Sequence, residues 1–309
     1  MSQMSEREFL DAQQRVFDRY GVDFESRLID VSGIIGRVHV IVTGEGPPVL
    51  MVIGGGIVAG TWAPLMAELG GYTLYAVDLP GQGLTDRTPY SSNKLRRTAV
   101  AFLEQVMDRL ELTTVPFVGQ SIGGMWSMWM ALDRPERVSA ISYIACPALI
   151  LGTSAPFPLR LATIPWIHRV INRLDPPSTK QVERLGKMVG ENLSDSPELR
   201  DLMLEYERLP GSSGSLLELH RAVIRLRGAQ PSVEITERQL MRVEKPAQFI
   251  WGEKDPFGPP SAGHRAAAVM PDAQVHVVAG GHAPWFGHPR RVGEIVKPFL
   301  SRHTMGTLR

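Results

Sequence analysis

An α/β fold with a mostly parallel sheet is the class that the sequence predicts. Short apolar runs, typical of buried strands, alternate with longer stretches of helical periodicity. Several of these runs end directly in glycine or in the turn Asp78-Leu79-Pro80-Gly81. Because a right-handed crossover helix returns the chain to the same edge of a sheet, this alternation indicates strands that run mostly in parallel.

The predicted elements follow one another in a regular order. Residues 5–20 form an amphipathic helix with Phe9, Val16 and Phe17 on one face. Strands are predicted at 38–42, 49–53, 72–77, 115–118, 138–145, 247–251 and 275–278. Helices are predicted at 61–69, 92–110, 122–132, 261–269 and 289–302. The helix at 122–132 is apolar nearly all round, so we expect it to be buried, with Trp126 and Trp129 in the core.

Residues 150–233 interrupt this alternation. They are rich in proline, contain helical segments near 180–190, 198–208 and 215–227, and show no strand run. Because this insertion leaves from the end of a strand, we expect it to lie over the carboxyl end of the sheet. The predicted organisation is a core of residues 1–149 and 234–309 with a helical cap, or lid, at 150–233.

Composition narrows the class of protein further. The 309 residues carry 33 Lys and Arg against 32 Asp and Glu, so no basic surplus favours a nucleic-acid partner. The single cysteine, Cys146, cannot form an internal disulfide or a thiolate-rich metal site, and we expect no metal. The polar N-terminus lacks the apolar stretch of a secretory signal, and no segment reaches the ~18 apolar residues of a membrane span. We therefore expect a cytoplasmic protein without a membrane partner; the sequence carries no signature of oligomeric state.

The sequence Gly119-Gln120-Ser121-Ile122-Gly123 is the strongest local motif. It has the Gly-x-Ser-x-Gly form, follows a predicted strand and opens a predicted helix, as a nucleophile elbow requires. The two glycines leave room for the crowded turn, which holds the serine at strained dihedrals costing about 1–3 kcal/mol. The alternative is an ordinary glycine-rich turn between a strand and a helix, because the chain contains 30 glycines. The context makes Ser121 a candidate nucleophile.

A serine hydroxyl needs a base, and the base needs a carboxylate to orient it. His282 follows Gly280-Gly281 just past the strand at 275–278, at the sheet edge where catalytic groups of α/β proteins gather. Asp255 follows the preceding strand at the same edge. His288 is the competing base and Glu253 the weaker candidate for the acid. The order Ser121, Asp255, His282 along the chain is that of one class of triad.

Acyl transfer also needs N–H donors aimed at the developing oxyanion. The Ile122 N–H lies at the start of a helix, where free donors and the helix dipole favour an anion. A second donor is expected in the loop Gly54-Gly55-Gly56-Ile57, whose glycines let the backbone approach a substrate closely. A phosphate-binding loop is the alternative, but neither GxxxxGK[ST] nor a spaced GxGxxG follows.

Together these motifs resemble the α/β-hydrolase superfamily, in the branch with a helical cap between the sixth and seventh strands. The stretch at 78–83 is similar to the family's Asp-x-Pro-Gly-x-Gly turn. The stretch at 251–255 resembles its acid-bearing loop, and Gly281-His282 followed by Pro289 resembles its histidine loop. The resemblance covers nearly the whole chain and implies an α/β-hydrolase fold, with a mostly parallel, eight-stranded sheet flanked by helices and a cap after strand 6.

The resemblance also implies roles for the site residues. Ser121 would be the nucleophile, His282 the base and Asp255 its partner, with no cofactor. The oxyanion donors would be Ile122 and Gly55, because the family's His-Gly pair falls at residues 53 and 54. An isoleucine stands at position 53 where histidine is usual, which leaves Gly56 or Ile57 open as the second donor. A serine at the elbow disfavours the branches with an aspartate nucleophile.

We therefore expect a serine hydrolase of the carboxylesterase type that cleaves an ester of a small, hydrophobic substrate. The substrate-binding candidates are Gly56, Trp166 and Trp285. Further apolar side chains of the cap that could line a pocket are Met188, Met203, Leu204 and Leu216. Three alternatives stay open: a carbon–carbon hydrolase of meta-cleavage products or a lactonase with the same triad, acyl transfer to an acceptor other than water, and a small-molecule receptor that retains the fold.

Overall fold

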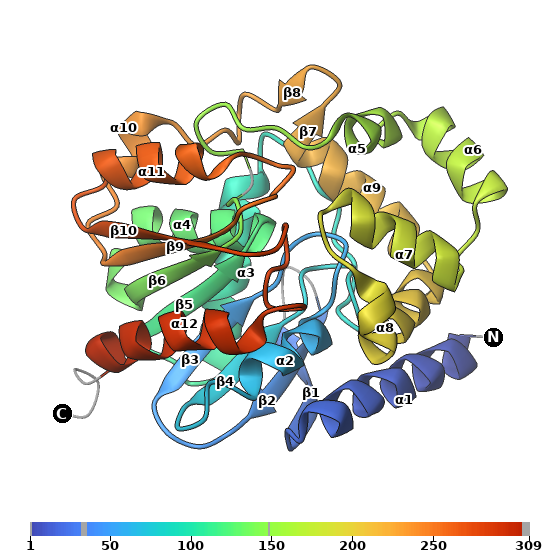
Figure 1. The fold of residues 1–309 in the computed structure, drawn as a ribbon, viewed down its shortest axis with the longest axis horizontal. Coiled ribbons are helices and arrows are strands. Elements are labelled where there is room, and N and C mark those ends of the chain that lie inside the picture. Colours follow the sequence, from blue (N-terminus) through green and yellow to red (C-terminus); the bar gives the residue numbers. More distant parts are fainter. Residues whose placement is uncertain (1, 32–35, 148, 305–309) are drawn as a thin grey trace.

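The structure is a computed structural model that describes residues 2–31, 36–147 and 149–304. Within these residues eight strands form one mixed sheet in the order β1-β2-β4-β3-β5-β6-β9-β10 (Figure 1). They are β1 (Phe24–Val31), β2 (Gly36–Thr43), β3 (Pro48–Val52), β4 (Thr73–Val77), β5 (Val115–Gln120), β6 (Val138–Ile144), β9 (Ala247–Gly252) and β10 (Ala273–Val278). Pairs β1–β2 and β2–β4 are antiparallel, and every other neighbouring pair is parallel. The predicted fold class is thereby confirmed.

Strand β1 is absent from the predicted elements. It lies at the edge of the sheet, and most of its side chains are exposed. A strand with so little buried surface has no continuous apolar run, so the criterion that identified the buried strands does not detect it.

Helices cover both faces of the sheet (Figure 1). On one face α2 (Ala63–Met66), preceded by the 3₁₀ turn Ala59–Trp62, contacts α12 (Pro289–Thr304). On the other face α3 (Leu95–Arg109) contacts α4 (Ile122–Asp133). At the end of the sheet opposite β1, strands β9 and β10 contact α11 (Pro260–Val269), which also contacts the short α10 (Glu237–Leu240). Helix α1 (Ser2–Tyr20) contacts α8 (Pro197–Arg208).

Helix α4 is buried in the core, as its composition predicts. Residues 122–131 of this helix are all buried, including both Trp126 and Trp129. Such a helix has no polar face and is stable only between the sheet and other apolar surface. Its first residue therefore has a fixed position at the carboxyl end of β5, which is where the elbow serine must be held.

Between β6 and β9 the chain is mostly helical, and we call helices α5 to α9 the cap helices. They are α5 (Phe157–Ala162), α6 (Pro165–Leu174), α7 (Thr179–Met188), α8 (Pro197–Arg208) and α9 (Ser212–Val223). A 3₁₀ turn at Leu193–Asp195 follows α7, and the two-stranded ribbon β7 (Ile224–Arg225) and β8 (Gly228–Ala229) follows α9. Figure 1 shows them beside the carboxyl ends of the parallel strands. The limits 150 and 233 of a separate domain stay a prediction.

Helices α5 and α6 are additional to the three predicted cap segments. Both helices begin among prolines of the proline-rich segment: Pro158 and Pro165 lie in the first turn of each helix. Proline is well tolerated there because the first N–H groups of a helix have no intrahelical acceptor. Helix α9 ends at Val223 instead of 227, because the ribbon β7–β8 begins at the next residue.

None of the helices in the described parts of the chain combines the length and the apolar character that crossing a bilayer requires.

Candidate active site

Ser121 occupies the sharp turn between β5 and α4. Its φ is 51° and its ψ −118°, a conformation that L-residues rarely adopt and that costs about 1–3 kcal/mol. The neighbouring glycines are required by space. A Cβ at Gly119 would lie 2.7 Å from Ser127 Oγ, and one at Gly123 would collide with the carbonyl oxygen of Val52. The turn therefore has the geometry of a nucleophile elbow.

Asp255 lies just past the carboxyl end of β9 with a fully buried side chain. Its Oδ1 accepts a hydrogen bond from the Phe257 N–H at 2.9 Å, and its Oδ2 accepts one from the Cys146 N–H at 2.8 Å. These two backbone donors fix the carboxylate plane from both sides. Glu253, the weaker candidate for the acid, is exposed to solvent.

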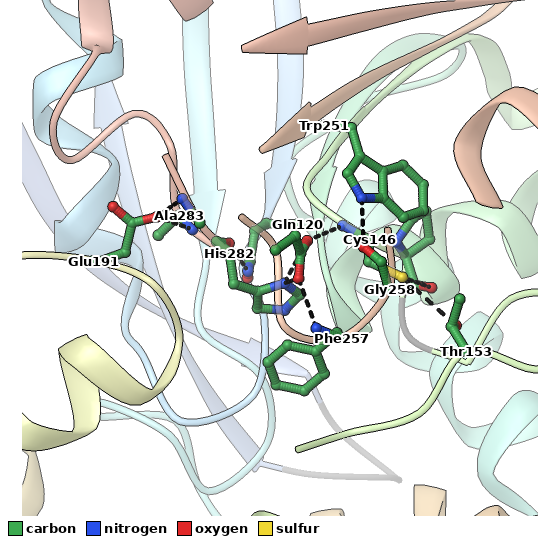
Figure 2. Close-up of polar contacts among 12 residues, drawn as sticks. Gln120, Cys146, Thr153, Glu191, Trp251, Phe257, Gly258, His282 and Ala283 are labelled. Carbon is green, nitrogen blue, oxygen red and sulfur yellow. Dashed lines mark hydrogen bonds and ion pairs between the residues drawn. The ribbon is translucent and has the colours of Figure 1, made fainter. Parts of the chain in front are cut away.

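His282 is brought to the acid by the loop after β10. Its Nδ1 lies 2.9 Å from both carboxylate oxygens of Asp255. Figure 2 shows the Phe257 ring lying against the imidazole, and the two ring centroids are 3.9 Å apart. The other ring nitrogen, Nε2, is buried and has no hydrogen-bond partner among the described residues. His288 is exposed. A histidine with Nδ1 held by a carboxylate and Nε2 free has the arrangement of a general base.

The loop after β3 is held by the side chain of Gln82. Its Oε1 accepts from the Gly56 N–H at 2.6 Å, and its Nε2 donates to the Gly54 carbonyl at 3.1 Å. Because the Gly56 N–H already donates to Gln82, the neighbouring Gly55 N–H is the better placed of the two to donate a hydrogen bond to a ligand. Within the described chain neither the Gly55 N–H nor the Ile122 N–H has a hydrogen-bond acceptor.

The turn that carries Gln82 is anchored by buried hydrogen bonds of Asp78. Asp78 Oδ1 accepts from the Ala59 N–H at 2.6 Å, and its Oδ2 lies 2.6 Å from His39 Nδ1. Both side chains are fully buried, and His39 Nε2 lies 2.8 Å from Ser26 Oγ. Asp78 thus links the turn to the loop after β3. His39, on β2, completes this support.

The candidate catalytic groups line one cavity of about 160 Å³ under the cap helices. Ser121, Ile122, Gly55, Gly56 and His282 all contribute to its wall. The cap contributes a mostly aliphatic surface: Leu159, Val182, Leu185, Met188, Met203 and Leu216. Leu204, a further predicted lining residue, is buried elsewhere.

Three polar residues of the cap region also face this cavity: Glu191, Glu207 and His220. Burial raises the pKa of Glu207, whose Oε2 accepts a hydrogen bond from Gln181 Nε2 at 2.7 Å. Burial lowers the pKa of His220 to about 4, so its imidazole is neutral at physiological pH. The cavity can therefore enclose an apolar group while offering few polar contacts to it.

The two tryptophans predicted to bind substrate lie outside the wall of this cavity. Trp166 lies on α6 with 61% of its surface exposed. Trp285 is fully buried, stacks on Trp62 at a centroid distance of 4.4 Å and donates its indole N–H to the Thr61 carbonyl. Phe257 and Phe286 supply the aromatic wall instead. The sequence marks an aromatic residue but not the direction of its side chain, which tertiary packing decides.

The sequence analysis did not identify the polar residues that hold the loops of the site in place. Gln82, Gln120 and Glu191 each hydrogen-bond a loop that carries a candidate catalytic group. For Gln82 and Gln120 a signal existed, since both lie inside recognised motifs. Glu191 lies in the cap without such a signal. No group of three or more His, Cys, Asp or Glu side chains that could hold a metal ion occurs within the described residues.

Fold and site together define an α/β hydrolase: a mostly parallel eight-stranded sheet with a serine elbow, an acid and a histidine at one edge. The chain belongs to the Alpha/beta hydrolase family, whose sequence model matches residues 49–295.

Comparison with known proteins places esterases among its relatives. The chain is 30% identical over 272 residues to a pimeloyl-[acyl-carrier protein] methyl ester esterase of Stenotrophomonas maltophilia, covering 85% of this chain and 96% of the relative. The solved structure of naproxen esterase (carboxylesterase NP) from Bacillus subtilis matches with a TM-score of 0.73 and 20% identity, over 94% of this chain and 96% of that one. A meta-cleavage product hydrolase from Pseudomonas fluorescens matches with a TM-score of 0.72 and 23% identity, over 90% and 97%. At these identities the two structures bear on the fold alone.

Proposed function

We propose that this protein is a serine hydrolase that cleaves a carboxylic ester of a small, hydrophobic substrate through an acyl-enzyme on Ser121. The observation that carries the proposal is the hydrogen-bonding of the two ring nitrogens of His282. Its Nδ1 is held by both oxygens of Asp255 at 2.9 Å, while its buried Nε2 faces no protein partner in the described chain and the residue shares a cavity with Ser121. The 30% identity to a methyl ester esterase supports an ester as the substrate.

In the proposed reaction Ser121 Oγ attacks the ester carbonyl while His282 Nε2 takes the hydroxyl proton. The negative charge that develops on the carbonyl oxygen is stabilised by the N–H groups of Ile122 and Gly55. The tetrahedral intermediate collapses, and the alcohol leaves with the proton from His282. Water then attacks the acyl-enzyme as His282 accepts its proton, which releases the acid and restores the serine.

The shape of the cavity favours a compact apolar group beside the scissile bond. A protein cavity of about 150 Å³ lined by aliphatic side chains binds benzene, and the cavity here has about 160 Å³. An acyl or alcohol group of phenyl size or a medium alkyl chain therefore fits. Gly56 borders the cavity with backbone alone. A Cβ at this position would lie 3.5 Å from Leu216, in van der Waals contact with the cavity wall.

The test is a series of p-nitrophenyl esters of increasing acyl length, assayed with the parent protein and with Ser121→Ala. We expect a burst of p-nitrophenol, turnover that disappears in the variant, and a maximum at medium chain length. A folded Ser121→Ala protein with full activity would contradict the mechanism. A folded parent without burst or turnover on any ester would favour a carbon–carbon hydrolase, a narrow lactonase or a receptor.

A further inference from the structure

The loop that carries His282 is held through four backbone groups of the three successive residues 281–283. Gln120 Nε2, from the elbow, donates to the His282 carbonyl at 2.9 Å. The other three bonds come from the cap segment Val189–Glu191, which follows α7. The Val189 carbonyl accepts from the His282 N–H at 2.8 Å, and Glu191 Oε1 accepts from the N–H groups of Gly281 and Ala283 at 2.8 and 2.9 Å. Figure 2 shows Glu191 pointing at the backbone beside His282.

The cap segment and the histidine loop also touch through backbone alone. A Cβ on Gly190 would lie 2.9 Å from Gly281 Cα, and a Cβ on Gly281 would collide with the Val189 carbonyl. Gly190 also has a φ of +82°, which side-chain-bearing residues rarely adopt. The backbones of the cap segment and the histidine loop therefore approach each other so closely that both contact positions require glycine.

Glu191 is an unusual residue for a purely structural contact. It is 6% exposed, and burial raises the pKa of its carboxyl group. Both of its bonds go to the amides on either side of one residue, the candidate base. Burying a carboxyl group is costly, and hydrogen bonds offset part of that cost; here both bonds go to the single oxygen Oε1 and therefore tie the two loop amides to one point.

We propose that the cap completes the catalytic base: Glu191, with Val189 and Gly190, is a positioning element that holds His282 in its reactive orientation. This inference rests on the proposed hydrolase function and deepens it. Helix α7, which lines the substrate cavity through Val182 and Met188, runs directly into this segment. The position of the cap over the substrate and the position of the base are therefore set by one continuous stretch of chain.

A positioning role predicts a loss in kcat with little change in KM. Removing the Glu191 acceptor leaves the aliphatic wall of the cavity and the oxyanion donors in place, although Glu191 itself borders the cavity, and it frees two amides beside the base. Misplacement of a catalytic group by about 1 Å can cost about 100-fold in rate. We expect kcat of Glu191→Ala to fall by about 10–100-fold, with KM nearly unchanged.

Glu191→Gln distinguishes geometry from charge. A glutamine oxygen can accept both N–H bonds, so this variant should recover most of the lost kcat. Glu183→Ala is the matched control, because it removes a partly buried cap carboxylate that pairs with Arg200 at 3.2 Å and does not reach the histidine loop. We expect its kcat to stay within about twofold of the parent, as for a substitution remote from the reacting groups. Gly190→Ala, which disturbs the same contact from the backbone, should resemble Glu191→Ala.

Hydrogen exchange of the amides of residues 281–283 supplies a readout that does not need activity. We expect exchange to be about tenfold faster in Glu191→Ala than in the parent, with Glu191→Gln close to the parent. An active parent, an inactive Ser121→Ala and an unchanged Glu191→Ala would overturn the positioning role and leave the hydrolase proposal standing. An inactive parent would remove the hydrolase proposal. Hydrogen exchange would then test the contact between Glu191 and the histidine loop by itself, and unchanged protection of residues 281–283 in Glu191→Ala would overturn the positioning role.

Discussion

Replacing Asp255 with asparagine is the perturbation for which the structure defines the consequences most closely. The two carboxylate oxygens are both acceptors: each lies 2.9 Å from His282 Nδ1, and each takes one backbone N–H, from Phe257 or from Cys146. Asparagine has one oxygen and one NH₂ group in the same space. In either orientation the NH₂ faces a backbone N–H, so one buried donor loses its acceptor.

Two effects of different size follow. The lost acceptor should lower the free energy of unfolding by about 1–3 kcal/mol. That corresponds to a fall in Tm of a few degrees, since 1 kcal/mol shifts Tm by about 2–4 °C in a domain of 150–250 residues and by less in a longer chain. The catalytic effect is larger, because an NH₂ that donates to Nδ1 places the imidazole proton on Nε2, which then cannot accept the serine proton. The expected loss in kcat is about 10⁴-fold, or about 5.4 kcal/mol.

The assay measures kcat and KM on the best p-nitrophenyl ester for the parent, Asp255→Asn and Asp272→Asn, together with thermal unfolding. Asp272 is exposed just before β10, so its variant controls for the loss of one negative charge. A folded Asp255→Asn protein with kcat within tenfold of the parent would refute the role of Asp255 in orienting the base.

Three further predictions concern the surroundings of the site. Gln82→Ala removes both bonds that hold the loop around Gly55, so kcat should fall by up to about 100–1,000-fold, the value of one oxyanion donor, and an unchanged kcat would contradict the role of this loop. Burial raises the pKa of the Cys146 thiol, so a thiol-specific dye at pH 8 should label the protein only after unfolding, and rapid labelling of the folded protein would be contrary to this expectation. The pKa of His220 is about 4 in the folded protein and about 6.5 in an unfolded chain, so the unfolded state binds the extra proton between these values and stability falls as pH falls. Urea unfolding should therefore show that the parent loses up to about 2 kcal/mol more than His220→Leu between pH 7 and pH 5, and equal losses would argue against a neutral, buried imidazole.

The sequence was most informative where structure is local. The elbow at Ser121, the acid-bearing loop and the histidine loop each follow a buried strand directly, and the carboxyl ends of parallel strands share one edge. The order of three short motifs therefore suffices to predict that Asp255 and His282 meet, and the structure brings them to 2.9 Å.

Residues that act across the fold could not be predicted in the same way. Glu191 and Ala283 are separated by 92 positions in sequence, and the bond between them depends on how the cap lies on the core. The side-chain directions of Trp166 and Trp285 depend on tertiary packing for the same reason. Helices α5 and α6 were missed because proline in the first turn of a helix and proline in a loop look alike in a single sequence.

The most direct test of the central claim is to trap the acyl-enzyme. The parent protein is mixed with a p-nitrophenyl ester, quenched in acid within the burst phase, digested and analysed by mass spectrometry. The account predicts one acyl adduct, on the peptide that contains Ser121, which disappears in Ser121→Ala and accumulates when deacylation is slowed. Full turnover of the ester without an adduct, or an adduct on another residue with activity retained in Ser121→Ala, would contradict it.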